Sequence, residues 1–179
     1  MAMEKSIYVV LSQTGTLLSK MLKMLTGAEY NHSSISLTPT LEEMYSYGRL
    51  NPYNPFVGGF VKEGKNIGTF KRFNKTIAKV LEIKVSEETY NKMKHALEYM
   101  EKHKKKLKYN YWGLFSAMFK HNHEAEGRFY CSQFVRSFLE AFGVSNAEAL
   151  PRVIKPIDFL NLTNKRVVYT GELSEYDCI

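Results

Sequence analysis

The sequence predicts a single domain of the α+β class, and three observations carry that prediction. Several segments are rich in β-branched and aromatic residues, as strands are. Other segments repeat their apolar residues at helical spacing. No internal repeat and no linker-like composition divides the 179 residues, of which 44% are hydrophobic. A chain of this length can bury a substantial core, so we expect one domain over residues 1–179.

The expected strands are separated by clusters of turn residues. Gln13-Thr14-Gly15 ends the first strand, and Thr38-Pro39-Thr40 joins the second to its hairpin partner. Residues 56–61 contain Gly58-Gly59 and predict either a short edge strand or a loop that approaches a ligand closely. A Gly-Gly pair without the rest of a phosphate-binding fingerprint does not predict a nucleotide site. The other expected strands are residues 6–12, 30–37, 42–49, 69–73, 77–85 and 165–170, where 69–73 and 77–85 form one strand or two.

The expected helices are defined by their apolar faces and by their end signals. The longest begins after Ser86, whose side chain can cap it, and runs to about residue 106 with His95 on its solvated side. Another begins at Cys131 and stops at Gly143, since a glycine just past the last apolar residue is a usual helix end. Further helical segments are expected at residues 16–25, 112–119 and 158–160.

The net charge of +7 indicates an acidic partner or a solvated basic surface. Much of the excess lies in the lysine run of residues 102–108, at the end of the longest expected helix, where cations complement the helix dipole. No base-reading motif accompanies this run, so nucleic acid is not an expected partner.

The N-terminus and the two cysteines favour a reduced, cytoplasmic protein. No apolar run approaches the ~20 residues needed to span a bilayer, and residues 1–6 lead into a mixed strand rather than a signal peptide. Cys131 and Cys178 suggest no disulfide framework. The histidines of His121-Asn122-His123-Glu124 have no third ligand at standard spacing, so we expect no metal, and we expect no cofactor.

Cys131 and His32 are the residues that suggest chemistry. Cys131 opens an apolar helix, where unpaired backbone N–H groups and the helix dipole favour a thiolate. The alternative is an inert buried cysteine, which is a common state of that residue. His32 opens a strand on the face that also carries Ser34 and Ser36, and it is either a catalytic base beside small neighbours or a structural histidine. Nucleophilic cysteine catalysis needs both residue types together.

The two motifs occur in an unusual order, with Asn31-His32-Ser33-Ser34-Ile35-Ser36-Leu37 early and Tyr130-Cys131-Ser132-Gln133-Phe134-Val135 late. In this order they resemble the circularly permuted papain-like hydrolases of the NlpC superfamily, and most of all the YiiX-like group of bacterial proteins. Residues 44–49, 51–56 and 12–15 are also similar to segments of this group. The resemblance spans roughly residues 6–170.

The resemblance implies a helix bearing the cysteine, packed on a small antiparallel barrel-like sheet, and a thiol hydrolase of amide bonds. It implies Cys131 as nucleophile and His32 as base. The third catalytic residue is expected at Ser46, with Glu43 as the alternative. Gln13 and Tyr130 are the expected substrate-binding residues. The substrate would be a small peptide, as in the cell wall, an amino-acid amide or an acyl compound.

Two other functions remain open. Lecithin retinol acyltransferase-like proteins share the permuted order, so acyl transfer to or from a lipid is the first alternative. It would call for contact with a membrane surface, and residues 17–25 are the sequence's candidate amphipathic segment for that contact. The second alternative is a binding module that keeps the fold and has no catalytic activity.

Overall fold

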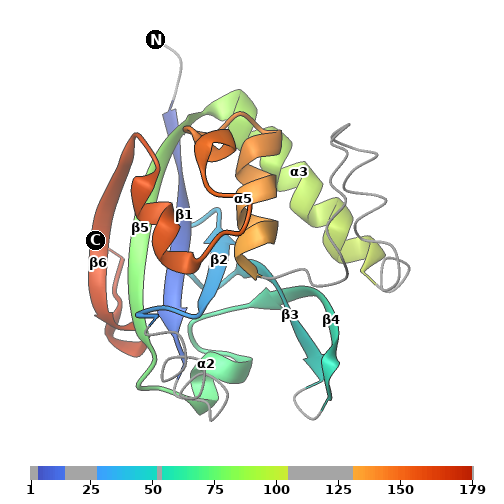
Figure 1. Ribbon diagram of the computed structural model, residues 1–179, viewed down its shortest axis with the longest axis vertical. Coiled ribbons are helices and arrows are strands. Elements are labelled where there is room, and N and C mark those ends of the chain that lie inside the picture. The colour runs from blue at the N-terminus through green and yellow to red at the C-terminus, as the bar shows by residue number, and fades with distance from the viewer. Residues whose placement is uncertain (1–3, 15–27, 52–53, 105–130, 179) are drawn as a thin grey trace.

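The computed structural model describes residues 4–14, 28–51, 54–104 and 131–178, and it has an α+β fold. Its centre is one six-stranded antiparallel sheet with the strand order β4-β3-β2-β1-β5-β6. Helices α3 and α5 lie against one face of the sheet, and the β3–β4 hairpin runs at a large angle to β5 and β6 (Figure 1). The strands are β1 (Glu4–Gln13), β2 (His32–Ser36), β3 (Met44–Asn51), β4 (Asn54–Glu63), β5 (Ile77–Ser86) and β6 (Lys165–Glu172). The helices are α2 (Gly68–Arg72), α3 (Glu87–His103) and α5 (Cys131–Ala141), with the short 3-10 helices η1 (Ala147–Ala149), η2 (Pro156–Asn161) and η3 (Leu173–Glu175).

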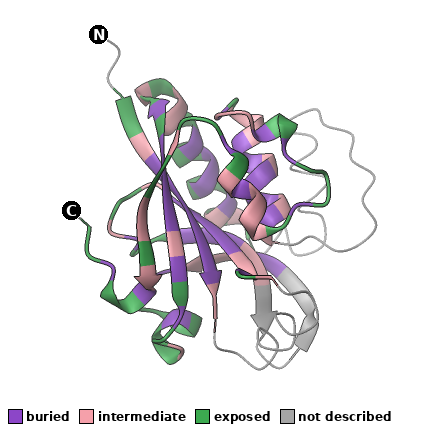
Figure 2. Ribbon diagram, turned by 60° about the vertical axis from the view of Figure 1, so that its left-hand side comes forward, coloured by how far each residue is buried: buried purple, intermediate pink, exposed green. Residues whose placement is uncertain are grey.

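Alternation of side chains along the strands divides the core between the two faces of the sheet. On one face, Val9 and Ile35 belong to the larger cluster, which also includes Leu97 of α3 and Phe138 of α5. On the other face, the smaller cluster packs β1, β3 and β5 against α2 and η3. Figure 2 shows the buried residues along the central strands and on the helix sides that face them. The sheet is therefore buried on both faces.

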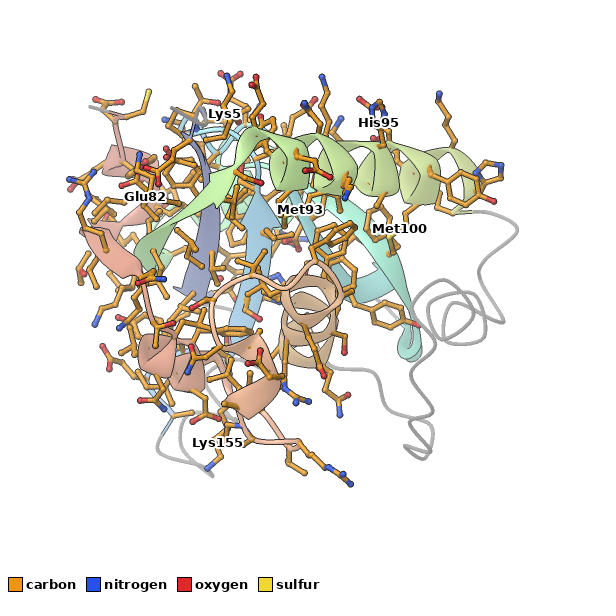
Figure 3. The ribbon with its side chains drawn as sticks, turned by 90° about the horizontal axis from the view of Figure 1, so that it is seen from above. Lys5, Glu82, Met93, His95, Met100 and Lys155 are labelled. Carbon is orange, nitrogen blue, oxygen red and sulfur yellow. The ribbon has the colours of Figure 1, made fainter. Side chains whose placement is uncertain are left out.

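The long helix α3 confirms its sequence prediction in detail. Ser86 caps it by accepting a hydrogen bond from the backbone N–H of Thr89 over 3.1 Å. Met93 and Met100 point toward the sheet, and His95 points away from it (Figure 3). Because an amphipathic helix buries its apolar stripe, this orientation follows directly from the spacing of its apolar residues.

Most expected strands are present, and the open choice at residues 56–61 is resolved as the edge strand β4, paired with β3. The prediction of a strand at residues 69–73 is wrong, because residues 68–72 form helix α2. Gly68 adopts a φ of +57°, which turns the chain out of the extended conformation, and Phe70 alone anchors the segment in the core. The described strands pair in an order that ends at β4 and β6, and all of them are antiparallel, as expected.

Several predicted features lie outside the described residues, namely the helices at residues 16–25 and 112–119, the segment His121-Asn122-His123-Glu124 and Tyr130. Within the described ranges, no helix combines the length and the apolarity that a membrane crossing requires.

Candidate active site

His32 is the first residue of β2, and its place is set by pairing with β1. The backbone N–H of Asn31 donates to the carbonyl of Ser12 over 3.1 Å, and the Cα atoms of Ser12 and His32 are partners across the two strands. On the same face of β2 the next side chains are Ser34 and Ser36, which are small and buried. The imidazole therefore stands at a strand end beside small polar neighbours, as the sequence predicts.

Glu63, the last residue of β4, holds the His32 ring. Its carboxylate oxygens Oε1 and Oε2 lie 3.1 and 2.9 Å from His32 Nε2. The Ser34 hydroxyl donates to Glu63 Oε2 over 2.7 Å and lies 3.3 Å from the same ring nitrogen. Since an ionised carboxylate only accepts hydrogen bonds, Nε2 carries the proton in this pair. The side chains of His32 and Glu63 are only 18% and 19% exposed, so the interaction is shielded from water.

A carboxylate on β4 must pass over β3 to reach β2. Glu63 is the Cα partner of Met44, and Val61 is the partner of Ser46, so these side chains share one face of the sheet. The β3 residues on that face are Met44, Ser46 and Gly48, and two of them are small. We infer that this small surface on β3 leaves the space through which the Glu63 side chain extends to His32.

Cys131 is the first residue of α5, and it meets the start of β2. Its Sγ lies 4.0 Å from the carbonyl oxygen of Asn31, and its side chain is close enough to that of His32 for each to shift the pKa of the other. The helix is held in place by its apolar face, since Phe134 and Phe138 are buried in the larger core cluster. The first N–H groups of a helix have no intrahelical acceptor and carry the positive end of its dipole, which favours negative charge at the sulfur.

The electrostatics of the three side chains favour an ion pair. Burial alone would lower the pKa of His32, but the negative charges of Glu63 and Cys131 and its hydrogen bonds to both raise that pKa well above its ordinary value. Burial alone would raise the pKa of Cys131, but the charge and hydrogen bond of His32 lower it below its ordinary value. Burial likewise opposes the charge of Glu63, and His32 and Ser34 overcome it, so the pKa of Glu63 is lowered. A thiolate, an imidazolium and a carboxylate are therefore the favoured charge states.

This arrangement matches what covalent catalysis by cysteine requires, namely a nucleophile, a base that shares its proton and a group that orients the base. His32 Nε2 faces Glu63, which leaves Nδ1 as the ring nitrogen for the sulfur. An oxyanion formed next to Cys131 would lie near the first N–H groups of α5, which can stabilise it. The geometry therefore permits acyl transfer through a thioester.

The structure brings together the predicted pair Cys131 and His32, but it does not place Ser46 or Glu43 in the third position. The Ser46 hydroxyl donates to the carbonyl of Ser33 over 2.7 Å. Glu43 forms an ion pair with Lys62 at 2.8 Å, and its side chain is 57% exposed. The group that contacts His32 is Glu63, which the sequence analysis missed. We correct the expected third residue accordingly.

The difference from the expectation lies in which strand supplies the third residue. Ser46 does share the face of His32, but a carboxylate from one strand further away reaches the ring. Alternation of side chains along β4 contains the information that identifies Glu63. Extending the expected strand 56–61 by two residues places Glu63 on the same face as Val61.

The two expected substrate-binding residues have different outcomes. Gln13 ends β1 and follows Ser12, the partner of His32, so it lies at the same end of the sheet as the site. Its side chain is half-buried. Tyr130 directly precedes Cys131 but lies outside the described residues.

Among the described residues, no group of three or more His, Cys, Asp or Glu side chains is arranged to hold a metal ion. Comparison with known proteins adds no assignment, since no family model, no curated protein and no solved structure matches this chain. The chemistry of this chain is therefore inferred from the geometry of Cys131, His32 and Glu63.

Proposed function

We propose that this chain is a cysteine hydrolase that cleaves an amide bond. Cys131 is the nucleophile, His32 is the base and Glu63 orients and charges His32. The observation that carries the proposal is the His32 ring, held by the shielded carboxylate of Glu63 and lying beside Cys131 at the start of α5. Perturbed pKa values on three adjacent groups at the ends of separate elements are typical of a catalytic site.

The reaction follows from the charge states of the site. The Cys131 thiolate attacks the carbonyl carbon of the substrate, and the electron pair of the C=O bond moves to oxygen, beside the N–H groups that begin α5. Collapse of this intermediate breaks the C–N bond, and the His32 imidazolium gives its proton to the leaving nitrogen. The neutral imidazole then takes a proton from water, whose oxygen attacks the thioester. Release of the acid restores the thiolate and the imidazolium.

Glu63 contributes in two ways to this cycle. Its hydrogen bond to Nε2 fixes the ring so that Nδ1 is presented to the sulfur. Its negative charge stabilises the imidazolium, and a charge-assisted hydrogen bond is roughly twice as strong as a neutral one. The carboxylate therefore supports both the orientation and the proton affinity of the base.

We assign the fold to the permuted papain-like group of the NlpC superfamily, with the YiiX-like proteins as the nearest resemblance. The order of a histidine strand before a cysteine helix supports this assignment. Packing of α5 on β2 and β3 of an antiparallel sheet supports it as well. The expected substrates are small peptides, amino-acid amides or acyl compounds. Both cysteines are free, which agrees with the reducing cytoplasm that we propose as the location.

The decisive experiment measures hydrolysis of a panel of amino-acid amides and short peptides, with thioesters included as more reactive acyl donors. We expect turnover by the full chain and by Cys178→Ala, and none by Cys131→Ala or His32→Ala. Mass spectrometry of the enzyme mixed with a thioester should find the acyl group on Cys131.

Two results would redirect the proposal. An acylated Cys131 that turns over only when a lipid acceptor is supplied would assign acyl transfer in place of hydrolysis. Equal and slow alkylation of Cys131 and Cys178 by iodoacetamide at neutral pH would show that Cys131 is structural and would leave only a binding role.

A further inference from the structure

Ser33, the neighbour of His32 in β2, joins the histidine strand directly to the cysteine helix. Its side chain is on the opposite face of the strand from His32, toward α5. There its hydroxyl lies 3.1 Å from the hydroxyl of Ser132, the residue after Cys131. Both serines are almost completely buried. The contact therefore links the residue after the base to the residue after the nucleophile.

The backbone around Ser33 is held on two sides. The carbonyl of Ser33 accepts the hydrogen bond of Ser46 over 2.7 Å, and Ser33 is the Cα partner of Leu11 in β1. The residue before His32, Asn31, has its carbonyl oxygen 4.0 Å from Cys131 Sγ. This short stretch of β2 thus lies against the sulfur, and the Ser33 hydroxyl meets the residue that follows Cys131.

The backbone N–H and the hydroxyl of Ser33 both bear on the pKa of the Cys131 thiol. Burial opposes ionisation of Cys131, and His32 makes the largest contribution against it. Hydrogen bonds from the backbone N–H and the hydroxyl of Ser33 then lower the pKa of the thiol further. Donors that bind an ionised group more strongly than its neutral form shift its protonation in this direction. The charged group that acts on the sulfur is His32, and Glu63 in turn pairs with His32.

The Ser33 hydroxyl has one proton and two neighbours that can accept it. It donates to Ser132 in the structure, and a neutral thiol can meanwhile donate to the Asn31 carbonyl. Once the thiol is ionised, rotation of both O–H bonds lets Ser132 donate to Ser33 and lets Ser33 donate to the sulfur. Hydroxyl protons rotate freely between such partners, and no covalent bond changes.

We propose that Ser33 is a positioning residue that holds the ionised sulfur of Cys131 against the His32 ring, with Ser132 donating to the Ser33 hydroxyl in that state. This inference rests on the proposed function of Cys131 as a nucleophile. The inference explains why Ser33 and Ser132, two hydroxyl residues, occupy a buried position. Their neighbours on the same face of the sheet, Leu11 and Ile35, are apolar. A hydroxyl buried there without a partner would destabilise the fold by about 1–3 kcal/mol.

The test is the pH dependence of alkylation of Cys131 by iodoacetamide, measured by mass spectrometry of its peptide, which needs no substrate. We expect Ser33→Ala to move the alkylation curve upward by about one pH unit, as loss of one hydrogen bond to a charged group implies. Ser132→Ala should move it by a smaller amount in the same direction. Ser33→Thr keeps the hydroxyl, so its alkylation curve should lie close to that of the chain without substitutions.

The matched control is Ser36→Ala, since Ser36 is equally buried on the same strand but its hydroxyl donates to the carbonyl of Glu43. It should leave the curve unchanged. A curve for Ser33→Ala that coincides with that of Ser36→Ala overturns the inference. A shifted curve in Ser33→Ala with an unshifted curve in Ser132→Ala overturns the role assigned to Ser132. If Ser33→Ala does not fold, the comparison of Ser132→Ala with Ser36→Ala tests the inference.

Failure of this inference can be told apart from failure of the proposed function. If Cys131 reacts no faster than Cys178 in the chain without substitutions, the assignment of Cys131 as the nucleophile is wrong. If Cys131 reacts fast at neutral pH and Ser33→Ala behaves like the unmodified chain, only the role of Ser33 is wrong.

Discussion

Glu63 Oε2 lies 2.9 Å from His32 Nε2, although the two residues belong to strands that are not neighbours in the sheet. The contact crosses β3, whose residues on that face include Ser46 and Gly48. Both partners are largely shielded from water, which makes the interaction stronger than a surface ion pair. This relationship gives the site its third member and supports most of the predictions that follow.

The first prediction concerns the identity of the third residue. Glu63→Gln replaces a charge-assisted hydrogen bond with a neutral one, so we expect kcat/KM to fall by roughly 10- to 100-fold. Glu43→Gln is the matched control, because Glu43 pairs with Lys62 on a half-exposed surface. Its kcat/KM should stay within about twofold of the unmodified chain. Equal losses in the two variants would place the catalytic carboxylate elsewhere.

The second prediction concerns pH. The thiol of Cys131 has a lowered pKa and His32 a raised one, so the ion pair exists between the two values and activity falls on both sides of that window. The acid limb should therefore lie below about pH 8.5, the ordinary thiol pKa. Glu63→Gln removes a charge that raises the pKa of His32, so the alkaline limb should move to lower pH. A profile of kcat/KM against pH for both proteins checks this, and an unmoved alkaline limb would contradict it.

The third prediction separates Ser46 from the chemistry. Its hydroxyl is buried and donates to the Ser33 carbonyl, so Ser46→Ala loses one neutral hydrogen bond. We expect the free energy of unfolding to fall by about 1 kcal/mol and kcat/KM to fall by about tenfold or less. Urea denaturation and steady-state kinetics measure the two quantities. Loss of activity as complete as in His32→Ala would return Ser46 to the third catalytic position.

The fourth prediction concerns stability at low pH, and it rests on Glu82 of β5. Ser6 donates to Oε1 over 2.7 Å, and Arg166 donates to Oε2 over 2.9 and 2.6 Å. The hydrogen bond from Ser6, opposed by burial and assisted by Arg166 and Lys84, lowers the pKa of Glu82 to about 2. Figure 3 shows Glu82 on the side of the molecule away from the C-terminal end of α3.

A carboxylate with a lowered pKa in the folded state adds stability above its unfolded pKa, here near 4.5, and loses it as the pH falls toward 2. Glu82→Gln should therefore lower the free energy of unfolding by about 2 kcal/mol at pH 7, and the difference from the unmodified chain should shrink below pH 4.5. Urea denaturation across this pH range checks it. Glu88→Gln, at an exposed pair with Lys92, should leave the urea midpoint unchanged. A difference that is constant with pH would contradict the assignment.

The nucleophile and the base could be found from the sequence because each depends on local structure. The apolar spacing after Cys131 and the stop at Gly143, where φ is +63°, define a helix whatever it packs against. Alternation after His32 likewise defines a strand and assigns its faces. Ser86 was recognised as a cap for the same reason, since it acts on a residue three positions away.

The third residue depended on relations that no local pattern contains. Glu63 is 31 positions from His32, and the two meet because β4 pairs with β3 and β3 pairs with β2. Strand order and register are set by the burial of the whole sheet against α3, α5 and α2, since a shift of one residue would move every side chain to the other face. The serine contact between β2 and α5 likewise required the helix to be packed on the sheet before Ser33 and Ser132 could meet.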